Sequence, residues 1–161
     1  MKVQNALITG SFDPPTLGHL DIIKRSAALF EGVTVCIFRN SEKKYMFDEQ
    51  VRLEMLKALC ADIPNVKIDC SDKPVVIYAK ENSISVIVKG VRGASDFEYE
   101  KTLHQAGNDI NPDVETVILF SRPELERVSS SIAREFLRYG LDTSAYLSPE
   151  VARIANGGLK K

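Results

Sequence analysis

The chain has 161 residues, 44% of them hydrophobic, and a formal net charge of −1 at pH 7. That length favours one domain over residues 1–161 with a substantial core, and the near-zero charge supplies no basic field for nucleic acid or an anionic membrane. No stretch approaches 18 consecutive apolar residues, and the first residues do not resemble a signal peptide. We therefore expect a cytoplasmic protein with no nucleic-acid or membrane partner.

The first predicted strand, over residues 3–8, leads to Gly10, where the missing Cβ permits a sharp turn or close approach to a ligand. Thr16 is a favourable N-cap for a helix that begins at residue 17 or 18. His19 then lies in the first helical turn, where free backbone N–H groups and the helix dipole favour an anion. The core-facing positions of this helix are predicted to be Leu20, Ile22, Ile23, Ala27 and Leu29.

A near-continuous apolar run over residues 33–38 is typical of a buried parallel strand. The polar loop that follows carries Lys43, and Asp48 is the predicted N-cap of a helix that extends to about residue 61. A lysine in such a loop is usually solvated. Because Lys43 follows a strand, at the edge where open α/β sheets bind ligands, it is also a candidate contact for an anion.

The next predicted strands cover residues 66–70 and 85–88, with a helix between them that is capped by Ser71 or Asp72 and carries Pro74 in its first turn. The second of these strands leads into Lys89-Gly90-Val91-Arg92-Gly93. Glycines flanked by cations after a strand are consistent with a phosphate-contacting loop, although a solvated turn explains them almost as well. A capping box of Ser95 and Glu98 is predicted to start the following helix, which runs to about residue 109.

A fifth strand is predicted over residues 114–120, followed by an irregular loop. Ser129-Ser130-Ser131 then precedes a helical pattern that ends at Gly140, so hydroxyls and free N–H groups gather at a helix start. A redundant N-cap is the plainer explanation of the three serines. The last predicted helix runs from residues 148–149 to 156–157, and a short basic tail, expected to fray, follows it.

This alternation of strands and helices predicts a single-domain α/β fold with a doubly wound, five-stranded parallel sheet. Gly10, Lys43, Lys89 and Ser129 each follow a predicted strand, so we expect them to face one crevice. The three cysteines lack metal-ligand spacing and are expected to be free, reduced core thiols.

Several of these stretches match family motifs. Gly-Ser-Phe-Asp-Pro followed by Thr-x-Gly-His resembles the signature of the nucleotidylyltransferase superfamily. Thr16, where many members have a first histidine, resembles the phosphopantetheine adenylyltransferases. The Gly-Val-Arg-x-x-x-Asp-Phe-Glu-Tyr-Glu stretch after Lys89 and the later Ser-Ser-Ser also resemble that family. The three motifs stand in family-like order and cover most of the chain, which favours a Rossmann-like nucleotidylyltransferase fold.

The resemblance implies a set of site residues. His19, Lys43 and Arg92 correspond to catalytic positions. ATP contacts are implied for Ser11, Phe12, His19, Gly90, Val91, Arg92, Glu100, Leu125, Glu126, Arg127, Val128, Ser129, Ser130 and Ser131. Acceptor contacts are implied for Ser11, Lys43, Val75 and Lys89. The chain departs from the family pattern at Ser11 (usually threonine), Lys89 (usually arginine), Tyr45 (often proline) and Leu125 (often tryptophan), and only Lys89 changes the chemistry of a phosphate contact.

The implied reaction transfers the adenylyl group of ATP to 4′-phosphopantetheine and gives dephospho-coenzyme A and pyrophosphate. Mg²⁺ is expected as a cofactor held mainly through the ATP phosphates, since the sequence offers no convincing protein cage. The family also implies a homohexamer, with coenzyme A as a candidate feedback inhibitor. Two alternatives are transfer to another phosphorylated acceptor, such as a pyridine mononucleotide, and a regulatory nucleotide-binding module without turnover. Thr16 and the Asp-Phe-Glu-Tyr-Glu stretch argue against the first, and the presence of His19, Lys43 and Arg92 argues against the second.

Overall fold

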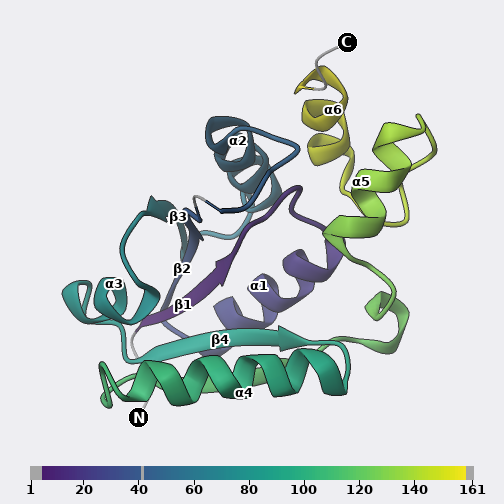
Figure 1. Ribbon diagram of the computed structural model, residues 1–161. Helices are drawn as coiled ribbons and strands as arrows, with labels where there is room; N and C mark the ends of the chain where they lie inside the picture. Colours follow the sequence, from purple (N-terminus) through teal and green to yellow (C-terminus); the bar gives the residue numbers. More distant parts are fainter. Residues whose placement is uncertain (1–4, 41, 159–161) are drawn as a thin grey trace.

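The computed structural model describes residues 5–40 and 42–158 (Figure 1). At its centre lies one sheet of five parallel strands in the order β3-β2-β1-β4-β5. The strands are β1 (Asn5–Gly10), β2 (Gly32–Phe38), β3 (Val66–Ser71), β4 (Val86–Val91) and β5 (Glu115–Phe120). The predicted fold class is therefore confirmed. The predicted strand start at residue 3 and the end of the basic tail lie outside the described residues, so the domain limits of 1–161 stay a prediction.

Helices connect and follow the strands. They are α1 (Leu17–Leu29), α2 (Glu49–Leu59), α3 (Val75–Glu81), α4 (Ala94–Asn108), the short 3₁₀ helix η1 (Pro123–Leu125), α5 (Ser130–Arg138) and α6 (Pro149–Gly158). The chain builds β1, β2 and β3 outward in one direction, then returns through α3 to place β4 on the other side of β1. The strand order thus reverses between β1 and β4, and such a reversal opens a crevice at the carboxyl ends of the strands.

Side chains of each strand alternate between two hydrophobic cores, as expected when both faces of a parallel sheet are covered. Ile8 and Val35 point to the larger core, where they meet buried residues of α1, α2, α5 and α6. Leu7 and Cys36 point to the opposite face and pack with buried residues of α3. Helix α4 lies on that second face beside α3 but contributes no buried residue (Figure 1).

Strand β4 is longer than predicted. Lys89, Gly90 and Val91 pair with residues of β5, so they are strand rather than loop. A Cβ at Gly90 would lie 2.9 Å from the side chain of Ile22, and the glycine therefore lets α1 pack closely on β4. The prediction of a glycine loop here was wrong, because the glycine serves helix packing rather than a turn.

Two predicted helix starts were also wrong. Helix α4 has Gly93 at its N-cap and no side-chain cap, so Ser95 and Glu98 form no capping box. Helix α3 has Pro74 at its N-cap rather than in its first turn, so neither predicted cap, Ser71 or Asp72, is the cap, and Ser71 is the last residue of β3. At α1, Leu29 is 57% exposed rather than in the core, since it lies in the last turn of the helix.

Three other helix ends follow the prediction. Thr16 is the N-cap of α1. Asp48 is the N-cap residue of α2 but makes no side-chain cap hydrogen bond. Gly140 follows α5 with a φ of +63°, the left-handed conformation that favours glycine after a helix.

Candidate active site

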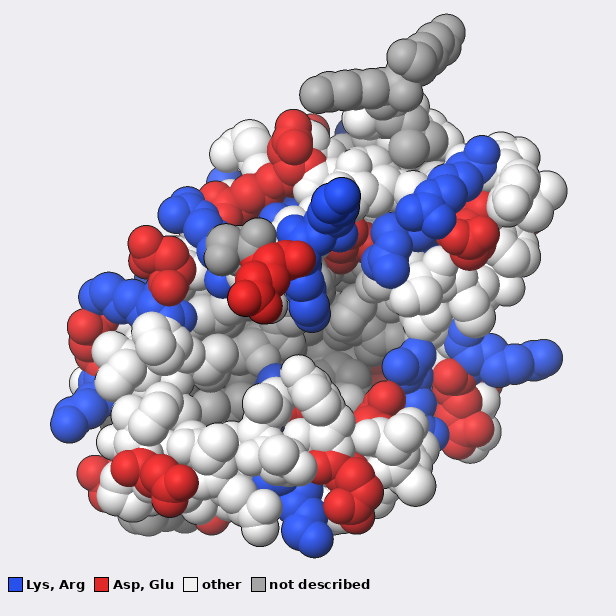
Figure 2. Space-filling view, in the orientation of Figure 1, with Lys and Arg blue, Asp and Glu red and all other residues white. Residues whose placement is uncertain are grey.

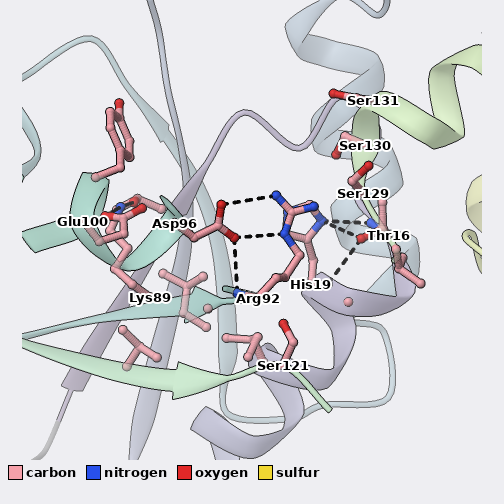
Figure 3. A pocket seen from close by; sticks show the side chains of 18 of the residues that line it. Thr16, His19, Lys89, Arg92, Asp96, Glu100, Ser121, Ser129, Ser130 and Ser131 are labelled. Atoms are coloured by element: carbon pink, nitrogen blue, oxygen red, sulfur yellow. Dashed lines mark hydrogen bonds and ion pairs between the residues drawn. The ribbon is translucent and has the colours of Figure 1, made fainter. Parts of the chain in front are cut away.

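A cavity of about 440 Å³ lies at the ends of β1 and β4, beside the first turns of α1 and α5 (Figure 3). Lys43, Lys89 and Arg92 line it together with Val128 and all three serines of Ser129–Ser131. An adjoining hollow of about 660 Å³ shares Lys43 and Lys89 and extends to Gly10, Ser11 and Val75. The four predicted loop positions thus line two connected hollows. Figure 2 shows side chains of both signs interspersed around a depression, without a field of one sign over this face.

The loop between β1 and α1 is held by two other elements. Arg52 of α2 is buried and donates a hydrogen bond of 2.7 Å to the backbone carbonyl of Ser11. Ser130, in the first turn of α5, donates a hydrogen bond of 2.8 Å to the carbonyl of Pro14. Because buried backbone carbonyls need partners, these contacts fix the path of a loop that has no regular structure of its own.

Asp13 joins this loop to the one that carries Lys43. Its buried carboxylate accepts hydrogen bonds from the backbone N–H groups of Met46 (2.8 Å) and Phe47 (2.9 Å). Arg134 of α5 donates a hydrogen bond of 2.7 Å to the Asp13 carbonyl. The end of the 39–47 loop is thereby attached to the β1–α1 loop, which positions Lys43 at the cavity.

Phe12 lies behind the site rather than in it. Its side chain is 1% exposed, and its ring packs edge-to-face against His19 with centroids 4.9 Å apart. Its φ of +49° is unusual for a residue with a large side chain. A Cβ at Gly10 would lie 3.1 Å from this ring, so Gly10 makes room for Phe12. The glycine of the sequence motif therefore serves the packing that supports His19.

His19 is held by the residue that caps its own helix. The backbone N–H of Thr16 donates to His19 Nδ1 (3.0 Å), and the Thr16 hydroxyl accepts from the backbone N–H of His19 (3.4 Å). Loss of hydration lowers the pKa of His19 to about 4, and the positive charge of Arg92 acts in the same direction. His19 is therefore neutral at physiological pH.

Arg92 is oriented by Asp96, one turn along the start of α4 (Figure 3). The Asp96 carboxylate accepts from Arg92 Nε (3.0 Å) and from the Arg92 backbone N–H (3.2 Å). These hydrogen bonds lower the pKa of Asp96, so the pair is ionised and the guanidinium is presented at the cavity wall. Asp96 was missed as a site residue, although its spacing of four from Arg92 is a signal for this pairing.

Lys89 makes two contacts at the floor of the site. Its Nζ donates to the hydroxyl of Thr9 (2.7 Å) and lies 3.2 Å from a carboxylate oxygen of Glu100. The side chains of Lys89 and Glu100 are only 17% and 16% exposed. Thr9 was not singled out from the sequence, because the sequence alone does not show which strand lies next to β4.

Of the remaining predicted site residues, some line a cavity and others do not. Val75 lines the hollow next to the cavity and a smaller apolar cavity of about 210 Å³ under α4. Val91 is buried and lines none of the three cavities. Leu125, Glu126 and Arg127, in and after η1, do not line the cavity, although Val128 does. Cavity residues absent from the prediction include Thr9, Asp96, Tyr99 and Ser121.

Neither a metal cage nor a disulfide occurs among the described residues. Those residues contain no group of three or more His, Cys, Asp and Glu side chains arranged to hold a metal ion. Cys36, Cys60 and Cys70 are free, as predicted, but Cys70 is only half-buried. Burial raises the pKa of the Cys60 thiol to about 11, which leaves it unreactive at neutral pH. Within the described part of the chain, no helix is both long and apolar enough to span a membrane.

Comparisons with known proteins agree with this geometry. The Cytidylyltransferase-like family model matches residues 7–136, which with the fold defines a nucleotidyltransferase. The chain is 43% identical over 156 residues to a phosphopantetheine adenylyltransferase from Caldanaerobacter subterraneus subsp. tengcongensis, covering 97% of this chain and 98% of that protein. The chain belongs to the phosphopantetheine adenylyltransferase family.

Two solved structures share the fold at low sequence identity. One is a proposed nicotinate-nucleotide adenylyltransferase from Vibrio parahaemolyticus, with a TM-score of 0.74 and 23% identity over 99% of this chain and 95% of that chain. The other is a Plasmodium falciparum nicotinic acid mononucleotide adenylyltransferase complexed with NaAD, with a TM-score of 0.67 and 18% identity over 94% of each chain. At these identities the likeness supports the fold alone.

Proposed function

We propose that the protein transfers the adenylyl group of ATP to 4′-phosphopantetheine, giving dephospho-coenzyme A and pyrophosphate. The observation that carries the proposal is the convergence of three cations on one cavity. Lys43 comes from the loop after β2, whereas Lys89 and Arg92 come from the end of β4 and the residue after it, and all three line the cavity together with His19. Two phosphorylated substrates need such a set of cations, because their negative charges must be brought together before they react.

The reaction requires the protein mainly to position the two substrates and to stabilise the charge that develops between them. An oxygen of the acceptor phosphate attacks the α-phosphorus of ATP, a bond to the α-phosphorus forms, and the bond to the pyrophosphate oxygen breaks. The phosphate oxygen is already a nucleophile, so no serine, cysteine or general base is activated. Hydrogen-bond donors and cations stabilise the charge that spreads over the α-phosphoryl oxygens and the leaving group.

In this proposal ATP and the acceptor together occupy the two connected hollows. His19, Arg92 and the start of α5 bind ATP phosphates, with Lys43 next to the reacting groups. The free N–H groups at the start of α5 suit an anion. The acceptor phosphate lies near Lys89 and Lys43, and the pantetheine arm extends toward Val75. The remaining ATP contacts implied by the family are Ser11, Phe12, Gly90, Val91, Glu100, Leu125, Glu126, Arg127 and Val128. Phe12 and Val91 are buried, so any contact they make runs through their backbone.

Mg²⁺ fits this site as a cofactor bound mainly through the ATP phosphates. Asp96 and Glu100 are the carboxylates on the cavity wall, and each already pairs with a cation, Arg92 and Lys89 respectively. Mg²⁺ commonly keeps several waters and takes substrate phosphates in place of protein ligands. Bound there, it would neutralise phosphate charge.

The assembly, location and regulation of the protein form the last part of the proposal. Large apolar side chains on α4 and at the end of β5 are exposed, among them Phe97, Leu103 and Phe120, which supports self-association; the family resemblance implies that the assembly is a homohexamer. Free cysteines support a cytoplasmic location. Coenzyme A contains the product's chemical groups and is proposed as a feedback inhibitor at the same site. Light scattering tests the assembly, a fluorescent fusion tests the location, and inhibition kinetics test the feedback by coenzyme A.

An acceptor panel tests the reaction. Purified protein is incubated with ATP, Mg²⁺ and one of three acceptors: 4′-phosphopantetheine, nicotinate mononucleotide or nicotinamide mononucleotide. Released pyrophosphate is measured by a coupled assay. Release with 4′-phosphopantetheine alone is expected. Release with a pyridine mononucleotide alone would assign the protein to the alternative acceptor class, and binding of ATP without release for any acceptor would favour a regulatory module.

A further inference from the structure

The protonation of His19 is fixed by a contact within its own helix start. The backbone N–H of Thr16 donates to His19 Nδ1 at 3.0 Å. A backbone N–H can only donate, so Nδ1 must carry a lone pair rather than a hydrogen. A neutral imidazole has one N–H, and that hydrogen must therefore be on Nε2.

The other ring nitrogen faces the cavity. Nε2 has no hydrogen-bond partner among the described residues. If it were fully buried, it would be a buried polar atom without a partner, but among the described residues the Tyr45 hydroxyl is the one such side-chain atom. Nε2 therefore keeps contact with solvent, and His19 lines the cavity. The edge-to-face contact with Phe12 restrains rotation of the ring. The N–H of Nε2 is thus a free donor at the cavity wall.

The surrounding charges act against a second proton on the ring. The cations that line the same cavity are Lys43 in the loop after β2, Lys89 in β4 and Arg92 directly after β4. The carboxylates that line it are Asp96 and Glu100 of α4. Each carboxylate is paired with a cation of the set, so neither is left to stabilise an imidazolium. A hydrogen on Nδ1 would also point at the hydrogen of the Thr16 backbone N–H and would replace a hydrogen bond with a repulsive contact. The low pKa of His19 agrees with this geometry.

We propose that His19 acts as a neutral hydrogen-bond donor through Nε2, and that Thr16 is the positioning residue that sets its tautomer and orientation. The role of the donor rests on the proposed function, because its acceptor is an ATP phosphate oxygen. A neutral donor keeps the same hydrogen-bonding capacity across the physiological pH range. An imidazolium with an ordinary pKa would lose its charge there.

Nitrogen NMR reads the tautomer directly. Long-range ¹H–¹⁵N spectra of the uniformly ¹⁵N-labelled protein distinguish a protonated from an unprotonated ring nitrogen. The chain has only two histidines, so the His104→Gln variant leaves His19 as the one imidazole to observe. We expect Nδ1 unprotonated and Nε2 protonated, without change between about pH 5.5 and pH 8. A hydrogen on Nδ1, or titration with a midpoint above about pH 6, would overturn the proposal.

Kinetics test the positioning role of Thr16. Thr16→Val removes the hydroxyl that holds the His19 backbone N–H (3.4 Å) and lies 3.1 Å from Nδ1, and Thr16→Ser keeps it. We expect Thr16→Val to lower kcat on the order of tenfold with a much smaller change in the KM for ATP, and Thr16→Ser to recover most of that loss. Both variants are first checked for wild-type circular dichroism. A folded Thr16→Val protein with wild-type kcat would remove the Thr16 hydroxyl from the positioning role, whereas the tautomer set by the Thr16 backbone N–H is tested by the NMR measurement.

The pH profile separates a neutral from a charged donor. If His19 acted as a cation, kcat would fall as pH rises through its pKa, whereas a neutral donor predicts no fall between about pH 6 and pH 8. The NMR measurement needs no substrate. A wrong tautomer therefore rejects this inference whatever the acceptor panel gives, and a failed acceptor panel rejects the proposed function whatever the spectrum gives.

Discussion

The ammonium group of Lys89 donates a hydrogen bond of 2.7 Å to the hydroxyl of Thr9, joining the ends of two neighbouring strands at the centre of the sheet. Glu100 approaches the same ammonium group from α4 to 3.2 Å. This lysine, at a position where the family resemblance implies an arginine, is thus held in place before any substrate binds. It is a compact charge with a fixed position rather than a planar fork.

The first prediction concerns this lysine. Lys89→Ala should weaken use of 4′-phosphopantetheine by about 2 to 4 kcal/mol in kcat/KM, since it removes a charged contact and leaves Glu100 unpaired next to the acceptor phosphate. Lys89→Arg should keep kcat and change the acceptor KM only modestly. Steady-state titration of each substrate measures both effects, and the constants for ATP should change less.

Lys67 supplies a matched control for Lys89. It is also a strand lysine with a carboxylate partner, Asp69 at 3.5 Å, but it lines none of the three cavities. Lys67→Ala should leave both sets of kinetic constants unchanged. If Lys89→Ala behaves like Lys67→Ala, Lys89 does not contact the acceptor.

A second prediction separates transition-state stabilisation by His19 from ground-state binding. His19→Ala should lower kcat on the order of 10² or more, because the loss of one donor to a developing negative charge costs about 3 kcal/mol. ATP affinity, measured by calorimetry without acceptor, should change far less. A large loss of ATP affinity with unchanged kcat would reverse this assignment.

The lowered pKa of His19 predicts a dependence of stability on pH. The pKa is about 4 in the folded protein and about 6.5 when unfolded, so between these values the unfolded chain binds more protons than the folded one. The free energy of unfolding should therefore rise with pH across this window, and a contribution on the order of 3 kcal/mol should be lost as the pH falls from about 6.5 to about 4.

His19→Gln isolates this contribution, because it keeps a polar side chain that does not titrate. Denaturant unfolding of both proteins at several values between about pH 4 and pH 7 gives the two slopes. The variant should lack the part of the slope due to His19. Equal slopes for the two proteins would show that the folded pKa of His19 is near its ordinary value.

A fourth prediction concerns Asp13 as the link between two loops of the site. Asp13→Ala leaves the buried N–H group of Phe47 and the partly buried N–H group of Met46 without partners and should cost about 2 to 4 kcal/mol of unfolding free energy. Because Lys43 lies in the attached loop, the KM for the acceptor should rise as well. Asp142 also accepts two hydrogen bonds, from the backbone and hydroxyl of Ser144, but it is exposed. Asp142→Ala should therefore cost less than about 1 kcal/mol with unchanged kinetics. Equal losses would show that the link is energetically unimportant.

Much of this site could be predicted from sequence because it depends on local order. Gly10 ends a strand, Lys43 and Ser129 each follow one, and parallel strands bring their carboxyl ends to one edge. Thr16 as an N-cap and His19 in the first turn follow from residue types three positions apart. These relationships can be predicted without knowing which strands are neighbours in the sheet.

Other parts depend on contacts between residues distant in the sequence. Asp13 binds backbone groups 33 and 34 residues away, and the approach of Ile22 to Gly90 requires α1 to cross β4. The burial of Phe12 likewise reverses the expectation that each residue of a ligand-binding motif faces the ligand. Local patterns report propensity and caps, but they contain no information on such packing.

The central claim is that the acceptor phosphate attacks ATP directly in a cavity that supplies cations and donors but no nucleophile. The most direct test uses ATP with a single sulfur at the α-phosphorus in one configuration and determines the configuration of the dephospho-coenzyme A analogue formed. One in-line displacement predicts inversion at phosphorus. Retention would require two displacements through an adenylylated protein side chain and would contradict the account.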